Sequence, residues 1–189
     1  PVIGGYFDVN YEMLMSLEAD LVILLVEHED AQKRLLELDF ETLAVNHSRV
    51  NGILESITKI ANRCGVESNG AVLRASIEAR MDQVRKRVSA RFQDHKYADL
   101  SRRSPNVDRT KADTLTPRHH DQDRPRVLVA VGRLMDKGSG GEIFISGRDG
   151  YYDDLIVLAG GLNAYRQETL KFPAISDEGL VRLDPDIIL

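Results

Sequence analysis

The stretch NYEMLMSLEADLVI at residues 10–23 returns near the other end of the chain as SDEGLVRLDPDIIL at residues 176–189, which is 176 − 10 = 166 positions later. Each copy begins with a small polar residue that can cap a helix and has a Glu two places later. Leucines at helix-facing positions follow, and then an Asp before an apolar run. Helix–strand units of this kind build α/β folds, so the repeat predicts two similar α/β lobes on either side of a long middle segment.

Composition limits the classes of protein to consider. The chain has 189 residues, of which 42% are hydrophobic and 29% charged, as in an ordinary soluble globular protein. The net charge of −5 provides no overall attraction to nucleic acid or to an anionic membrane, and we expect no nucleic-acid partner. The longest apolar run, residues 21–26, is too short to span a bilayer. The single cysteine, Cys64, excludes an internal disulfide and a cysteine-rich zinc site, and we expect it to be buried.

Residues 1–66 read as half of a parallel α/β lobe. Residues 21–26 lack polar alternation, as expected of a strand covered on both faces. Helices are expected at residues 11–17 and from about 30 to 38, with a second strand at residues 42–46. Ser48 can then cap a helix that ends at Gly65.

A long helix is predicted from about residue 68 to 95 and, with its flanks, forms a bridging segment over residues 67–97. Its apolar residues recur at spacings of four and three: Leu73, Ile77, Met81, Val84, Val88 and Phe92. Its basic residues between 80 and 91 are read as a solvated face. Residues 98–125 lose all periodicity and are polar and charged, so a mobile loop is expected there.

Regular apolar patterns resume in residues 126–189, which we interpret as the first half of the second lobe. Residues 127–131 form an apolar run typical of a buried strand. A short strand is expected at residues 142–146 and a helix at residues 151–159, which Gly160 ends. The second copy of the repeat closes the chain.

Three motifs resemble one known family. They are GGYFDVNYE at residues 4–12 with LEADLVI at 17–23, GRDGYYDDL at 147–155 with LAGGLNA at 158–164, and FPAISDE at 172–178 with LDPDII at 183–188. In this order, with a long helix between them, they resemble the helical-backbone periplasmic solute-binding proteins of ABC importers. That family takes up iron–siderophore complexes, haem, cobalamin and some oxyanions.

The resemblance implies two Rossmann-like lobes with parallel sheets joined by the long helix, both lobes being incomplete here because the chain resembles the family's central section. It implies a non-catalytic carrier outside the cytoplasm, periplasmic or membrane-anchored, that passes a metal chelate to an ABC permease. A ferric siderophore is the first choice of ligand, followed by haem, cobalamin and oxyanions. The metal would arrive within the ligand, so neither a cofactor nor a protein metal site is expected.

Candidate ligand-binding residues follow from the rule that ligands lie at the carboxyl ends of parallel strands. Glu27 and His28 leave the first buried strand at that end. The family places its Gly-Gly-Tyr loop at the same cleft, which adds Tyr6 and Phe7 as aromatic contacts. The resemblance also makes Glu29 the candidate for docking onto the permease.

The second lobe offers guanidinium and phenol groups. Arg133 ends a predicted strand, and Arg148 lies in the turn before Tyr151 and Tyr152. A guanidinium suits an anionic siderophore or oxyanion because it forms paired hydrogen bonds with such groups.

Two other classes of protein stay open. One is a nucleotide-dependent α/β enzyme or chelatase, although the sequence has no phosphate loop or nucleophile elbow. The other is a sensor domain that uses the same fold without transport. In either case two half-lobes leave sheet edges unpaired, which predicts that the piece self-associates.

Overall fold

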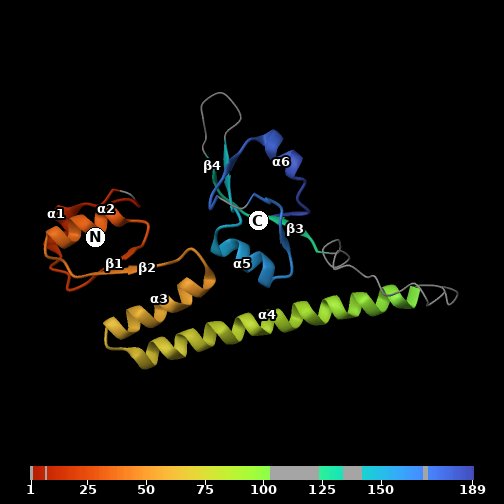
Figure 1. The fold of residues 1–189 in the computed structure, drawn as a ribbon, viewed down its shortest axis with the longest axis horizontal. Helices are drawn as coiled ribbons and strands as arrows, with labels where there is room; N and C mark the ends of the chain where they lie inside the picture. Colours follow the sequence, from red (N-terminus) through yellow and green to blue (C-terminus); the bar gives the residue numbers. More distant parts are fainter. Residues whose placement is uncertain (1, 7, 103–123, 134–141, 168–169) are drawn as a thin grey trace. The chain divides into compact units, whose positions relative to one another are not determined.

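The computed structural model describes residues 2–6, 8–102, 124–133, 142–167 and 170–189, with the backbone alone for residues 93–102 and 133. Phe7 and most of the loop expected at residues 98–125 therefore lie outside the described residues. The chain forms two compact units, Pro1–Arg74 and Ala75–Leu189 (Figure 1). This division falls within the long helix, which the sequence analysis treated as a separate bridging segment.

The first unit alternates helices and strands as predicted. Its elements are α1 (Tyr11–Ser16), β1 (Val22–Leu25), α2 (Glu29–Glu37), β2 (Thr42–Val45) and α3 (Val50–Arg63). The side chain of Asn10 caps α1 by accepting from the backbone amide of Met13. β1 and β2 pair in parallel. The α/β pattern of this unit is therefore the one that the repeat predicts.

Three local expectations for the first unit were wrong. Arg49, and not Ser48, is the N-cap of α3, because Asn46 Oδ1 accepts from the Ser48 amide at 2.8 Å and holds Ser48 in a turn before the helix. Cys64 is exposed at the end of α3. Ile23 in β1 is 43% exposed, so this strand is not covered on both faces.

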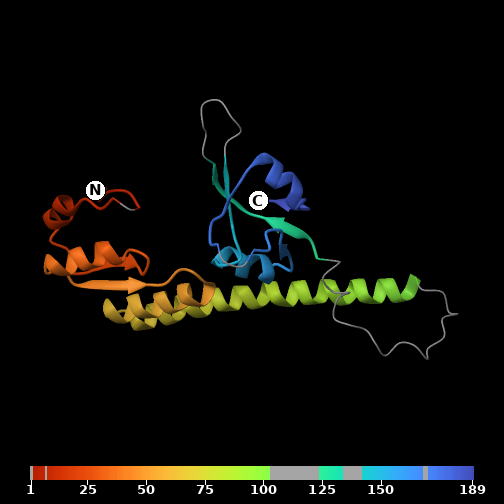
Figure 2. The same ribbon diagram turned by 45° about the horizontal axis from the view of Figure 1, so that its top comes forward.

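The long helix α4 (Glu67–Arg102) is continuous over 36 residues. It therefore includes residues 98–102, which the sequence analysis placed in the loop; nothing in this stretch, such as a Pro or Gly, stops a helix. Figure 2 shows α3 and the first turns of α4 side by side, and Gly70 of α4 lies against Ala61. None of the helices that the structure describes has the length and apolar character needed to cross a membrane.

The second unit contains the rest of α4 and two small sheets. The sheets and helices consist of β3 (Arg126–Leu128), β4 (Ala130–Arg133), β5 (Ile143–Ile145), α5 (Tyr151–Leu158), β6 (Leu162–Asn163), β7 (Ala174–Ile175), α6 (Asp177–Leu183) and β8 (Ile187–Ile188). The strand order is β6-β3-β8 in one sheet and β4-β5-β7 in the other. Leu128 and Ile145, one from each sheet, pack with Ala164 and Tyr165 in a shared core.

The run at residues 127–131, predicted as one strand, is divided between the two sheets. β3 pairs in parallel with β6 and β8, as expected, whereas β4 pairs antiparallel with β5. The connection from β4 to β5 is too short for the crossover that parallel strands need, so the two strands form a hairpin. The expectation of parallel sheets therefore holds for β6-β3-β8 and is wrong for β4-β5-β7.

Candidate functional site

A short looped segment before α1 presents Tyr6. Gly4 and Val9 form an antiparallel bridge, and the amide of Gly5 donates to the carbonyl oxygen of Asp8 at 2.9 Å. Gly4 has a φ of 113°, and a Cβ atom there would overlap the Asp8 carbonyl oxygen. Only glycine fits this position without strain, so the loop that carries Tyr6 depends on Gly4.

The carboxyl end of β1 supplies the facing side of the site. The Val26 amide donates to the Val45 carbonyl at 3.0 Å, which continues the parallel pairing one residue past β1. The chain then turns, with the His28 amide donating to the Leu25 carbonyl at 3.0 Å, and α2 begins at Glu29. This turn places Glu27 and His28 at the edge where parallel α/β sheets bind ligands.

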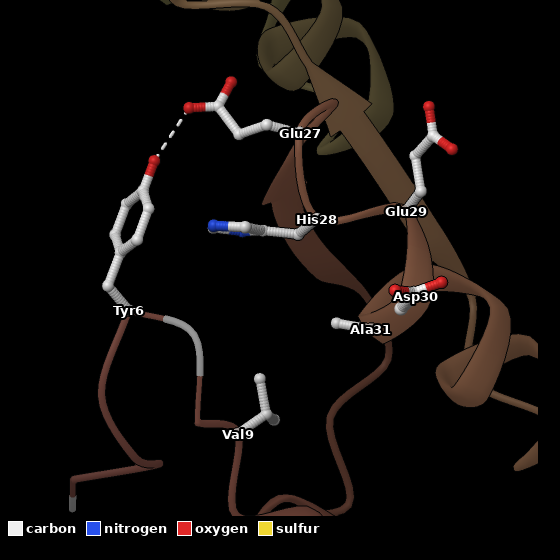
Figure 3. A pocket seen from close by; sticks show the side chains of 7 residues that line it. All are labelled: Tyr6, Val9, Glu27, His28, Glu29, Asp30 and Ala31. Atoms are coloured by element: carbon white, nitrogen blue, oxygen red, sulfur yellow. Dashed lines mark hydrogen bonds between the residues drawn. The ribbon is translucent and has the colours of Figure 1, made fainter. Parts of the chain in front are cut away.

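Tyr6 contacts both of these residues. Its hydroxyl donates to Glu27 Oε1 at 2.7 Å, and its ring lies edge to face with the His28 imidazole, with centroids 4.6 Å apart and planes at 76°. Figure 3 shows the His28 ring pointing toward Tyr6 while Glu27 reaches the phenol oxygen. Edge-to-face contacts of this kind stabilise aromatic pairs, so the three side chains hold one another in position.

These side chains border a pocket of about 320 Å³ within the first unit (Figure 3). Its lining consists of Tyr6, Val9, Glu27, His28, Glu29, Asp30 and Ala31. Three of the seven are carboxylates, and Arg and Lys are absent from this lining. The pocket therefore offers an aromatic wall, an imidazole and a negative potential.

The environment of Tyr6 changes its acidity. Partial burial of the phenol, its hydrogen bond to Glu27 and the negative charge of Glu27 together raise the pKa of Tyr6 from 10.0 to about 12. All three effects disfavour the phenolate. Near neutral pH the hydroxyl therefore stays protonated and remains a hydrogen-bond donor.

The second unit holds another group of predicted residues at the start of α5. The rings of Tyr151 and Tyr152 stack with centroids 4.3 Å apart, and Arg148 is exposed in the preceding turn. The hydrogen bond with Tyr152, partial burial and the charge of Tyr152 raise the pKa of Tyr151 to about 12. Aromatic faces and a guanidinium thus lie close together in the sequence at one helix start.

Asn163 holds the turn that carries Arg148. Its side-chain amide donates to the carbonyls of Ser146 and Gly147 at 3.3 and 3.2 Å, and its Oδ1 accepts from the Tyr165 amide at 3.0 Å. The Asn163 side chain is buried, and both its amide nitrogen and its amide oxygen form hydrogen bonds. Asn163 therefore has a structural role in fixing this turn. Asn163 lies in the motif at residues 158–164, but the sequence pattern predicted no role for it.

The structure brings together Tyr6, Glu27, His28 and Glu29 from the predicted set. Phe7 lies outside the described residues, and Arg133 ends β4 with its side chain outside them. Val9, Asp30 and Ala31 complete the pocket and were missed. Asp30 could have been found, since it follows three predicted residues at the same strand end.

Among the residues that the structure describes, no group of three or more His, Cys, Asp or Glu side chains could hold a metal ion.

No protein-family model matches the sequence, and no curated protein matches it. Solved structures do match. A periplasmic haem-binding protein from Pseudomonas aeruginosa is similar with a TM-score of 0.70 and 19% identity, covering 100% of this chain and 56% of that one. The periplasmic vitamin B12-binding protein BtuF of Vibrio cholerae is similar with a TM-score of 0.67 and 14% identity, covering 98% and 59%.

An ABC transporter substrate-binding protein from Listeria monocytogenes is similar with a TM-score of 0.62 and 18% identity, covering 98% of this chain and 58% of that one. The chain thus spans less than two thirds of the length of these structures. At such identities the likeness establishes the fold and confirms the fold class predicted from the repeat. The chain has the mixed helix-and-sheet fold, with parallel sheets and a long helix, of the substrate-binding proteins of ABC transporters.

Proposed function

We propose that this chain belongs to the substrate-capturing component of an ABC importer and that its cargo is a metal chelate, with haem as the best match to the pocket. The observation that carries this proposal is the contact of Tyr6 and His28 within one pocket at the carboxyl end of β1. Tyr and His are both established protein ligands of haem iron. Solved proteins of the same fold bind haem and vitamin B12, which supports a macrocyclic cargo.

The charge of the pocket decides between classes of chelate. Glu27, Glu29 and Asp30 make three of the seven residues in the pocket lining acidic, which disfavours an anionic ferric siderophore or an oxyanion. Ferric haem carries its two carboxylates on one edge of the ring, so it can turn its positively charged metal centre toward this acidic pocket. We therefore rank haem above the siderophore that the sequence analysis put first.

Glu27 has a defined part in this proposal. A phenol must lose its proton to ligate ferric iron, and the pKa of about 12 keeps Tyr6 protonated while the pocket is empty. Glu27 Oε1 accepts the hydrogen bond from the Tyr6 hydroxyl at 2.7 Å. When iron binds the phenol oxygen in place of the proton, Glu27 is therefore positioned to accept that proton. Glu27 thus orients the phenol before binding and takes up or relays the proton on binding.

Arg148 with Tyr151 and Tyr152, and also Arg133 and Phe7, remain candidate ligand-binding residues. A guanidinium would pair with a propionate carboxylate of haem. We further propose that the protein acts outside the cytoplasm, that Glu29 contacts the permease and that the protein is not an enzyme.

Titration with haem tests the proposal directly. We expect the wild-type chain to bind haem saturably, with a shifted Soret absorbance band. Glu27→Gln should weaken binding by about tenfold, as loss of a partner to a metal ligand commonly does. Tyr6→Phe should weaken it further. Tyr11→Phe is the matched control, because Tyr11 lies in α1 and does not line the pocket.

Parallel titrations separate the alternatives. Metal-free protoporphyrin tests whether the iron matters, cobalamin and a ferric siderophore test the other chelates, and a nucleotide tests the enzyme alternative. Saturable binding of the siderophore without binding of haem would show that the ligand is a siderophore, and the proposed role in chelate uptake would stand. Binding of none of the chelates would contradict the proposed role.

A further inference from the structure

One stretch of α4 concentrates positive charge on an otherwise acidic chain. Residues 80–91 contain five basic side chains and one acidic side chain, a net charge of 5 − 1 = +4. Since the whole chain carries −5, the remaining residues sum to −5 − 4 = −9. The charge of this helical stretch is therefore opposite to that of the rest of the protein.

Part of this charge forms a single row. Arg80, Val84, Arg87 and Arg91 follow at spacings of four, three and four, which puts them on one face of a helix. We call these four residues the arginine row; at the α-helical rise its eleven steps extend over about 16 Å. All three arginines are exposed, and Val84 between them is 36% exposed.

The charges on the other side of the helix behave differently. Arg85 forms an ion pair with Asp82, so its charge is largely offset. Among the residues whose side chains the structure describes, Arg80, Arg87 and Arg91 form no ion pair with a carboxylate. Lys86 is exposed on the other side of the helix, so the arginine row is the largest group of positive charges on one face of this stretch.

We propose that the arginine row docks onto the surface of an anionic phospholipid bilayer. A guanidinium binds phosphate oxygens in pairs, and a straight row on a rigid convex helix fits a planar array of phosphates. An exposed valine between arginines suits the boundary between headgroups and acyl chains. Each arginine near an anionic membrane contributes about fivefold in affinity, so three together give measurable attachment at low salt. This attachment would be separate from cargo binding.

Vesicle sedimentation tests this docking. The wild-type chain is mixed with vesicles of phosphatidylcholine alone or of phosphatidylcholine with phosphatidylglycerol. We expect binding only to the anionic vesicles and release at high salt. Arg80→Gln with Arg87→Gln should weaken binding by about 25-fold, whereas Arg80→Lys with Arg87→Lys should retain most of it.

The control has the same net charge as the glutamine variant. Arg85→Gln with Lys86→Gln also removes two positive charges but leaves the arginine row intact, and we expect a loss of less than about fivefold. Circular dichroism checks that both variants keep their helix. Equal losses in the two variants, or equal binding to both kinds of vesicle, would overturn the proposal.

Absence of any vesicle binding would also overturn it and would point to an acidic protein surface as the partner of the row. Haem titration of the same Arg80→Gln with Arg87→Gln variant keeps the two proposals apart. We expect its haem affinity to be unchanged, because neither arginine lines the pocket.

Discussion

Tyr6 is the residue on which the proposed site depends, and its ionisation can be measured. Its pKa is raised to about 12 by partial burial, by the hydrogen bond to Glu27 and by the charge of Glu27. The folded protein therefore holds this proton more tightly than the unfolded chain does. The stabilising contribution is fully present below pH 10 and is lost as the pH rises toward 12.

Absorbance of tyrosinate during an alkaline titration checks this. The difference between wild type and Tyr6→Phe should have its midpoint near pH 12. Glu27→Gln should lower that midpoint only in part, because burial is the largest cause and remains. The difference measurement is needed since the pKa of Tyr151 is also raised to about 12. A Tyr6 midpoint near 10 in the wild type would show that Glu27 does not hold the phenol.

Gly4 offers a second test at the same scale. Its φ of 113° and its closeness to the Asp8 carbonyl mean that Gly4→Ala must distort the loop, at a cost of about 1–3 kcal/mol. We expect the variant to lose haem binding, because the distortion moves Tyr6 away from Glu27. Gly5→Ala is the control, since no atom that the structure describes lies within 4 Å of its added methyl group. Equal haem affinity in the two variants would contradict the role assigned to the loop.

Among the elements, the helices and the parallel strands β1 and β2 could be predicted from the sequence. Capping residues and apolar spacing are local signals, and β1 and β2 lie in continuous apolar runs. The division of residues 127–131 between two sheets could not be predicted, because both strands have the same apolar character and only tertiary pairing separates them. The end of α4 was missed because the apolar stripe stops after Phe92, with His95, Lys96 and Asp99 at the positions where it would continue.

The candidate site shows the same limit. Glu27 and His28 could be predicted because they follow a strand, and the carboxyl end of a parallel strand is a general ligand position. The contact of Tyr6 with both of them could not, since it depends on the bridge between Gly4 and Val9, for which single-residue patterns give no signal. Resemblance to a family supplied Tyr6 where the residue pattern did not.

The packing of α4 on the second unit gives a prediction for one element. Gly160 ends α5 with a φ of 85°, and a Cβ atom there would lie 2.8 Å from Val88 and 3.1 Å from Phe92. Gly160→Ala should therefore lower the free energy of unfolding by about 1–3 kcal/mol. Urea unfolding measures this, with Gly132→Ala in β4 as the control, because no atom of the described residues lies within 4 Å of its added methyl group. Equal stabilities would mean that α4 does not pack tightly against Gly160.

At the scale of the whole molecule, apolar side chains are exposed at the edges of two sheets. β8 lies at the edge of its sheet, where Ile188 and Leu189 are 55% and 70% exposed. Among the strands that the structure describes, β1 pairs only with β2, and it exposes Ile23. Edges of this kind offer unpaired backbone groups and apolar side chains to another chain.

We therefore expect the chain to self-associate with rising concentration through these strand edges. Light scattering on eluting fractions should show a mass that increases with loading. Ile188→Lys should reduce the association because a charge on an edge strand opposes pairing. Val181→Lys is the control, since Val181 is also apolar and more exposed but lies in helix α6 and not in a strand. A strictly monomeric wild type at high concentration, or equal effects of the two lysines, would show that the strand edges do not join the chains.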